Sequence, residues 1–140
     1  MLARPDADHE ETAPQAAAPL IQRLACPLVG RTQTIRLMRG TKLHRAYGAD
    51  EATEQFRCSF GLNPAHRSLM LSGHLQCAGV DPQGEVRAVE LATHRFFLAT
   101  LFLPQLASRP GAPHPLITAY LLAAAALRSE RTGNKPIATR

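Results

Sequence analysis

Residues 96–103, FFLATLFL, form an almost wholly apolar run that constrains this chain more than any other feature. A tight corner at residues 92–94 precedes the run, and a loop punctuated by Pro follows it. Such a run is typical of a strand with both faces covered, as in the middle of an α/β sheet. In α/β folds the functional side chains follow the carboxyl ends of such strands. Here Leu103, Pro104 and Gln105 take that place, and none of them can act as a nucleophile, an acid or a base.

Weaker local signals predict the elements around this run. Alternation of apolar and polar residues predicts strands, and Gly or Pro marks where strands and helices begin or end. The Asp-Pro-Gln-Gly tetrad at residues 81–84 fits a type I turn that joins its two flanking strands as a hairpin. A closing helix rich in Ala and Leu is expected to cover one face of the sheet. The predicted strands span residues 20–24, 34–38, 54–60, 75–78 and 86–91, and the predicted helices span 41–48, closed by Gly48, a segment opened by Pro64, and 116–127.

Length and composition indicate one globular domain without a membrane or nucleic-acid partner. The chain has 140 residues, of which 45% are hydrophobic and 19% charged. Its apolar runs are shorter than the ~20 residues that span a bilayer, and its start lacks the apolar core of a signal peptide. We therefore expect a cytoplasmic protein. The formal net charge is +5, but the basic residues are scattered and match no nucleic-acid motif, so no nucleic-acid partner is expected.

Three cysteines, Cys26, Cys58 and Cys77, lie far apart and form no C-x-x-C pair. They therefore predict neither a disulfide framework nor a zinc site. The adjacent residues 9–11, His-Glu-Glu, do not form a metal site either, because neighbouring side chains do not converge. Cys26, before a Pro, and Cys58 are candidate reactive thiols, although no base lies beside either in the sequence and free Cys is commonly buried. The candidate bases for such a thiol are His44, His66 and His94.

Two segments carry matches to a known family. Residues 94–117 align with the pattern H-P-F-F-V-A-x-Q-F-H-P-E-F-x-S-R-P-x-x-P-H-P-L-F, which V-E precedes in the family, and residues 54–63 align with E-R-H-R-H-R-Y-E-V-N. Both patterns resemble the class I glutamine amidotransferase domain of CTP synthase. The chain is most similar to bacterial CTP synthase C-terminal region-related proteins, which lack the synthetase half. The matching residues are Glu54, Arg57, Asn63, Val89, Glu90, His94, Phe96, Phe97, Ala99, Phe102, Pro104, Ser108, Arg109, Pro110, Pro113, His114, Pro115 and Leu116.

The resemblance implies an α/β fold, the C-terminal portion of a class I glutamine amidotransferase-like domain with a flavodoxin-like three-layer arrangement. We expect residues 1–19 to be a flexible lead-in, residues 20–128 to form this partial domain, and residues 129–140 to be a polar tail. The nucleophile half of the domain has no counterpart in the chain. Such a half-domain is expected to leave a strand edge uncovered, which invites pairing with another chain. A homo-oligomer or a partner chain that completes the sheet is therefore expected.

The family's chemistry, glutamine-dependent amination of UTP to CTP, uses a Cys-His-Glu triad in its glutaminase domain. By resemblance, the catalytic His and Glu fall on Leu103 and Gln105, and the Arg that holds glutamine falls on Ser59. Ser cannot reproduce the charged fork of Arg. No cysteine has the G-x-C-x-G setting of the nucleophile, so no catalytic residue, confident substrate-binding residue, metal or cofactor is assigned.

Three functions remain open from the sequence. The first is a CTP synthase-related glutamine amidotransferase-like protein in a catalytically degenerate or truncated form. The second is a non-catalytic module that binds a nucleotide or a partner. The third is a different enzyme that uses Cys26 or Cys58 as its thiol. The sequence therefore does not decide whether the chain is an enzyme.

Overall fold

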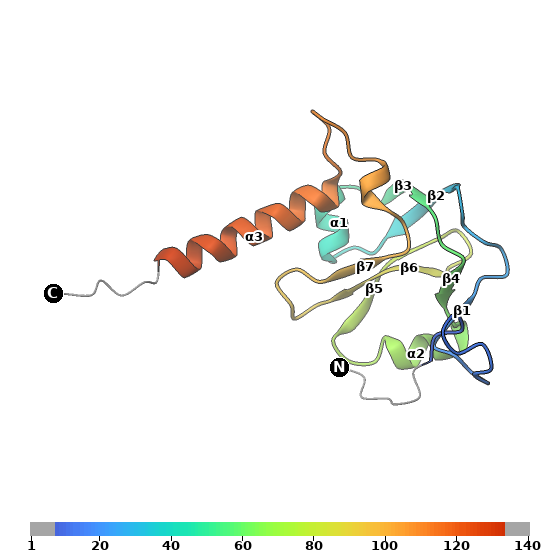
Figure 1. Ribbon diagram of the computed structural model, residues 1–140. Coiled ribbons are helices and arrows are strands. Elements are labelled where there is room, and N and C mark those ends of the chain that lie inside the picture. Colours follow the sequence, from blue (N-terminus) through green and yellow to red (C-terminus); the bar gives the residue numbers. More distant parts are fainter. Residues whose placement is uncertain (1–7, 134–140) are drawn as a thin grey trace.

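The computed structural model describes residues 8–133, which form a curled five-stranded sheet, a small two-stranded sheet and helices around them (Figure 1). The larger sheet has the order β3-β2-β5-β6-β7, and the smaller one pairs β1 with β4. All these strand pairs are antiparallel. The strands are β1 (Ile21–Arg23), β2 (Arg31–Leu37), β3 (Glu51–Phe56), β4 (Phe60–Leu62), β5 (Leu75–Val80), β6 (Val86–Leu91) and β7 (Leu98–Thr100). The helices are α1 (Lys42–Tyr47), α2 (Arg67–Met70) and α3 (Pro115–Gly133), with 3-10 turns η1 (Pro64–His66) and η2 (Pro104–Leu106).

The predicted turn between β5 and β6 is confirmed. Asp81 Oδ1 accepts hydrogen bonds from the backbone N–H groups of Gln83 and Glu85, and Gly84 takes the left-handed conformation with φ 83°. The other carboxylate oxygen of Asp81 lies 2.6 Å from Nη2 of the buried Arg87. A single acidic side chain thus organises the turn and anchors it to β6.

Helix α1 is also confirmed, and both of its ends show why it forms. The Thr41 hydroxyl accepts a hydrogen bond from His44 N–H at the first turn. Gly48 closes the helix in the left-handed conformation and donates its N–H to the carbonyl of His44. Between these caps, Leu43 is fully buried against the sheet. The caps set the ends of the helix, and Leu43 packs it against the sheet at β5.

The core lies inside the curl of the larger sheet. Phe56 and Phe102 are fully buried, and their rings meet edge to face at 6.0 Å between centroids. Their backbones form an antiparallel bridge, and Leu103 N–H donates to the carbonyl of Gln55. Because the chain after β7 returns to β3 in this way, the sheet closes partly on itself.

The predicted central strand over residues 96–103 is wrong. Within the described residues, β7 spans only Leu98–Thr100 and pairs with β6 alone, so it is an edge strand. Phe97 lies in the turn before it and is 44% exposed, whereas Phe102 contacts β3. The apolar residues of the run therefore lie in three places: the turn before β7, the edge strand β7 itself, and the contact with β3 that closes the curl. They do not form one strand with both faces covered.

The predicted strand over residues 54–60 is divided. β3 ends at Phe56, and the chain then changes sheets, because Cys58 and Ser59 use their carbonyls to accept hydrogen bonds from Leu28 and Leu24. It continues as β4 from Phe60, which pairs with β1. One alternating pattern thus contributes to two sheets.

Helix α3 runs to Gly133, so residues 129–133 are helical where a polar tail was predicted. Leu116 is its one buried residue within the described part of the chain, and the rest of the helix projects away from the sheets (Figure 1). It therefore does not cover a sheet face along its length. No helix among residues 8–133 is long and apolar enough to cross a bilayer.

Part of the predicted lead-in, residues 1–7, lies outside the described residues. Residues after it contact β1: His9 bridges Ile21, and the Glu10 carboxylate accepts a hydrogen bond from Arg23 N–H. His9 and Glu10 thus lie beside the small sheet. Among the described residues, no group of three His, Cys, Asp or Glu side chains is placed to hold a metal ion.

Candidate functional site

The positions that correspond by resemblance to the family's catalytic His and Glu lie at η2. Leu103 precedes this turn and is half-buried, and Gln105 lies within it and is exposed. The backbone of Leu103 is held by Gln55 at the end of β3. The corner thus has a defined position where the chain leaves the sheet, but a hydrocarbon side chain and an amide cannot transfer protons there.

The structure does not join the candidate thiols to the candidate bases. Cys26 is exposed in the loop after β1, and Cys58 Sγ donates to the carbonyl of Phe60 at 2.8 Å. His44 contacts Asp50, His66 contacts the carbonyl of Ala18, and His94 accepts a hydrogen bond from Phe96 N–H. Each imidazole therefore has a local partner, and no hydrogen bond among residues 8–133 links any of the three to a thiol.

Alkylation of the native protein with iodoacetamide should follow exposure. We expect Cys26 to react first, at about the rate seen in the denatured chain, because exposure alone does not activate a thiol. Cys77 should react slowly, because burial raises the pKa of its thiol. Mass spectrometry of timed samples measures each rate, with the urea-denatured chain as the control. A cysteine that reacts faster in the native protein than in urea would contradict this prediction.

A buried polar cluster not anticipated from the sequence joins Tyr47, Glu54 and His114. His114 Nε2 lies 2.9 Å from Glu54 Oε1, and the Tyr47 hydroxyl donates to the same carboxylate oxygen. The side chains of His114 and Glu54 are only 3% and 4% exposed. Burial, followed by the hydrogen bond to Glu54, raises the pKa of the Tyr47 phenol far above its ordinary value. Only the resemblance to the family patterns singled out Glu54 and His114, and it did not indicate that they meet.

The geometry of this cluster indicates a structural role. Leu116 N–H donates to His114 Nδ1, so the proton of the neutral ring lies on Nε2, which faces Glu54. Both ring nitrogens are therefore occupied by protein groups. The cluster joins α1, β3 and the start of α3 at one point, where Glu54 and His114 are buried and Tyr47 is half-buried. It holds the helices on the sheet, and the burial of Glu54 and His114 keeps both side chains away from a substrate in solvent.

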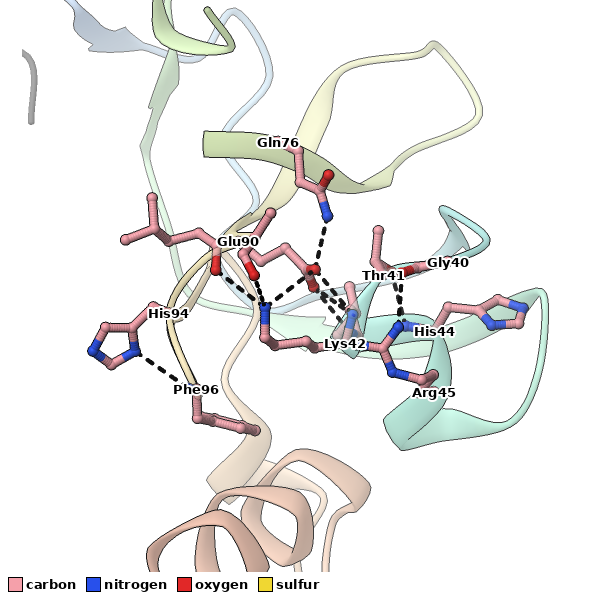
Figure 2. Close-up of polar contacts among 12 residues, drawn as sticks. Gly40, Thr41, Lys42, His44, Arg45, Gln76, Glu90, His94 and Phe96 are labelled. Atoms are coloured by element: carbon pink, nitrogen blue, oxygen red, sulfur yellow. Dashed lines mark hydrogen bonds and ion pairs between the residues drawn. The ribbon is translucent and has the colours of Figure 1, made fainter. Parts of the chain in front are cut away.

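A second buried carboxylate, Glu90 on β6, lies against the first turn of α1 (Figure 2). It accepts hydrogen bonds from the backbone N–H groups of Lys42 and Leu43 and from Gln76 Nε2, at 2.7–3.1 Å. An anion at this place satisfies donors that a helix N-terminus leaves unpaired. The Lys42 ammonium donates to the carbonyls of Leu91 and Ala92 and lies 4.0 Å from Glu90.

A groove of about 610 Å³ opens between α1, the β6–β7 turn and α3. Its walls include Lys42, Arg45, Arg95 and the Phe96 ring, a set that resembles an anion site. Each cation, however, already has a protein partner: Arg45 donates to the carbonyl of Gly40, and Arg95 pairs with Glu130 at 2.6 Å. Lys42 is held by two carbonyls. Arg95 and Lys42 each lie beside a carboxylate, Glu130 and Glu90, whereas Arg45 keeps its charge and most of its N–H groups.

Comparison with curated proteins finds CTP synthases, whereas no family model matches the chain. It is 41% identical over 90 residues to CTP synthase of Synechococcus sp. (strain RCC307), a match that covers 64% of this chain and 16% of that protein. It is 33% identical over 135 residues to CTP synthase of Chloroflexus aggregans, which covers 89% of this chain and 25% of that protein. The chain thus spans about a quarter or less of the length of these relatives.

Two solved structures share the fold. The glutaminase domain of Trypanosoma brucei CTPS with bound acivicin matches with a TM-score of 0.78 at 24% identity, over 86% of this chain and 51% of that one. A Thermoplasma acidophilum protein described as part of a GMP synthase matches with a TM-score of 0.61 at 13% identity, over 80% and 51% of the two chains. These likenesses confirm the expected class I glutamine amidotransferase-like fold.

Proposed function

Since this chain carries a CTP synthase glutaminase-like domain, we propose that it retains the scaffold of that domain as a partner-binding module and does not hydrolyse glutamine. The observation that carries the proposal is the composition of the η2 corner. By resemblance, Leu103 and Gln105 take the positions of the family's catalytic His and Glu. The proposal describes a degenerate form of the domain.

Physical chemistry supports the loss of hydrolysis. Amide hydrolysis through a thioester needs a thiolate, a base that moves protons, and a group that orients the base. Removal of one member of such a triad costs roughly 10⁴–10⁶ in rate. Here Leu103 and Gln105 have no proton-transfer chemistry, and no thiol within the described residues is hydrogen-bonded to an imidazole.

Purified protein incubated with glutamine should therefore release glutamate and ammonia no faster than a buffer control. The double variant L103H/Q105E should be equally inactive, because it restores the imidazole and the carboxylate but not the nucleophile. CTP synthase of Chloroflexus aggregans, assayed in parallel, is the positive control. Ammonia release that depends on glutamine and disappears in C26S or C58S would overturn the proposal.

Partner binding is favoured over the two other functions by particular contacts. Two of the cations in the groove between α1 and α3, Arg95 and Lys42, lie beside Glu130 and Glu90, which lowers the positive charge that a nucleotide would meet and weakens the case for a nucleotide. The candidate thiols lack a base partner, which weakens the case for a thiol enzyme. The sheet, by contrast, ends at β7 in an uncharged edge strand.

A further inference from the structure

The outer edge of β7 presents backbone groups that β6 does not use. Leu91 N–H donates to the carbonyl of Phe97, and Leu101 N–H donates to the carbonyl of Arg87. In an antiparallel pair, alternate residues direct their backbone groups to the same neighbour. Ala99 therefore faces β6, whereas the N–H and C=O groups of Leu98 and Thr100 point away from it. This edge can accept another strand.

An apolar hollow lies beside this edge on each face of the sheet. On the α3 side, a hollow of about 220 Å³ is lined by Leu98, Phe96, Ile117 and Tyr120. A second hollow, of about 150 Å³, lies over β6 and β7, where it is lined by Ala99 and Leu101 together with Val86, Arg87, Ala88 and Val89 of β6, and by Met70 and Ile21. Successive residues of β7 point to opposite faces, so Leu98 and Ala99 contribute to different hollows, one on each side of the strand, while Thr100 borders both. A strand that fills both must be apolar on both faces.

The opposite edge of the sheet differs from this one. The exposed side chains of β3 are polar, namely Glu51, Thr53 and Gln55. Its last residue, Phe56, forms a backbone bridge with Phe102. Charged or covered edges are how folded proteins avoid unwanted pairing. β7 carries no charged residue, the bridge to β3 covers the chain only beyond it at Phe102, and Tyr120 beside it is 57% exposed. The unprotected edge therefore indicates a missing neighbour.

We propose that β7 and its two flanking hollows, which together we name the docking edge, bind an apolar β-strand from a polypeptide that supplies the complementary half of a glutaminase-type domain. Each of the two solved neighbours is covered by this chain over 51% of its length, so about half of each has no counterpart here. The incoming strand pairs with Leu98 and Thr100 and places alternate side chains in the two hollows. A second copy fits less well, because each copy has a formal charge of +5. The inference rests on the scaffold role proposed above and names its partner.

The test uses the whole chain co-expressed with the half of the Chloroflexus aggregans CTP synthase glutaminase domain that precedes the matched segment. A tag on this chain should recover both polypeptides, and light scattering should give a 1:1 complex. Hydrogen exchange should show that the amides of Leu98 and Thr100 exchange fast in the chain alone and become protected in the complex. Co-expression that yields no complex overturns the proposal.

Substitutions locate the interface. Y120D should weaken the complex at least about tenfold, because it places a charge in the hollow beside the strand. L121D is the matched control on the same helix: Leu121 is 59% exposed, does not line either hollow, and should leave the affinity unchanged within about twofold. T100P removes an N–H that points away from β6 and should also prevent pairing. Thermal unfolding of each free variant verifies that it folds.

The outcomes separate this inference from the proposed function. A complex that is insensitive to both Y120D and T100P would place the interface elsewhere and overturn the docking edge. A homodimer of the chain alone that Y120D dissociates would assign the edge to a second copy and also overturn it. A complex that hydrolyses glutamine would contradict the proposed function and leave the docking edge standing.

Discussion

Replacement of Glu90 by Ala should lower the free energy of unfolding by about 3–5 kcal/mol, because a buried charged acceptor is lost while its donors stay buried. The carboxylate is 1% exposed and accepts hydrogen bonds from Lys42 N–H, Leu43 N–H and Gln76. Without it, the first turn of α1 loses the anion that balances its N-terminal partial charge. The helix should therefore detach from β6 more readily.

Urea unfolding followed by circular dichroism measures this loss. E90Q, which keeps the size and one acceptor oxygen, should fall between the wild type and E90A. E51A is the control on the exposed side of β3 and should change the free energy of unfolding by less than about 0.5 kcal/mol. If E90A and E51A were equally stable, Glu90 would not be the anchor of α1.

Replacement of His114 by Ala should cost about 3–5 kcal/mol of the free energy of unfolding, because it leaves the buried Glu54 carboxylate with only Tyr47 as a partner. The second oxygen of Glu54 is already without a hydrogen-bond partner among the described residues. A carboxylate in that state has no water to replace the lost imidazole. The loss should appear as a lower urea midpoint with a similar slope.

An apolar replacement of the whole cluster tests this cause. The triple variant Y47F/E54M/H114L should recover at least about half of the stability lost in H114A, since removal of all buried polar partners avoids an unpaired charge. H94A, in the exposed β6–β7 turn, is the control and should cost less than about 0.5 kcal/mol. If the triple variant were less stable than H114A, the polar contacts themselves would be the main source of stability.

Local signals in the sequence predicted the parts of the fold that depend on a few neighbouring residues. Thr41 and Gly48 mark the two ends of α1, and residues 81–84 form the expected turn before β6. β6 itself, Val86–Leu91, matches its predicted span. These elements were predictable because caps and turns depend on hydrogen bonds within a few residues.

The candidate site was predictable only in its residue identities. The family resemblance placed Leu103, Gln105 and Ser59 at positions with functional counterparts, and the structure shows that Leu103 directly precedes η2 and Gln105 lies within it. Whether a cysteine meets a histidine depends on contacts between distant segments, which spacing in the chain does not reveal. The docking edge was not predictable either, because an apolar strand has the same sequence pattern in the middle of a sheet and at its edge.

By itself, the amino-acid sequence determined the caps, the β5–β6 turn, the type of most elements and the absence of the expected triad residues at Leu103 and Gln105. Only the tertiary structure decided that β7 lies at an edge, that Glu90 caps α1 across 48 residues, and that His114 meets Glu54 across 60. The physical reason is that burial and pairing are properties of segments brought together by the sheet's curl. The neighbours of a polar side chain along the chain do not specify which distant group will be its hydrogen-bond partner.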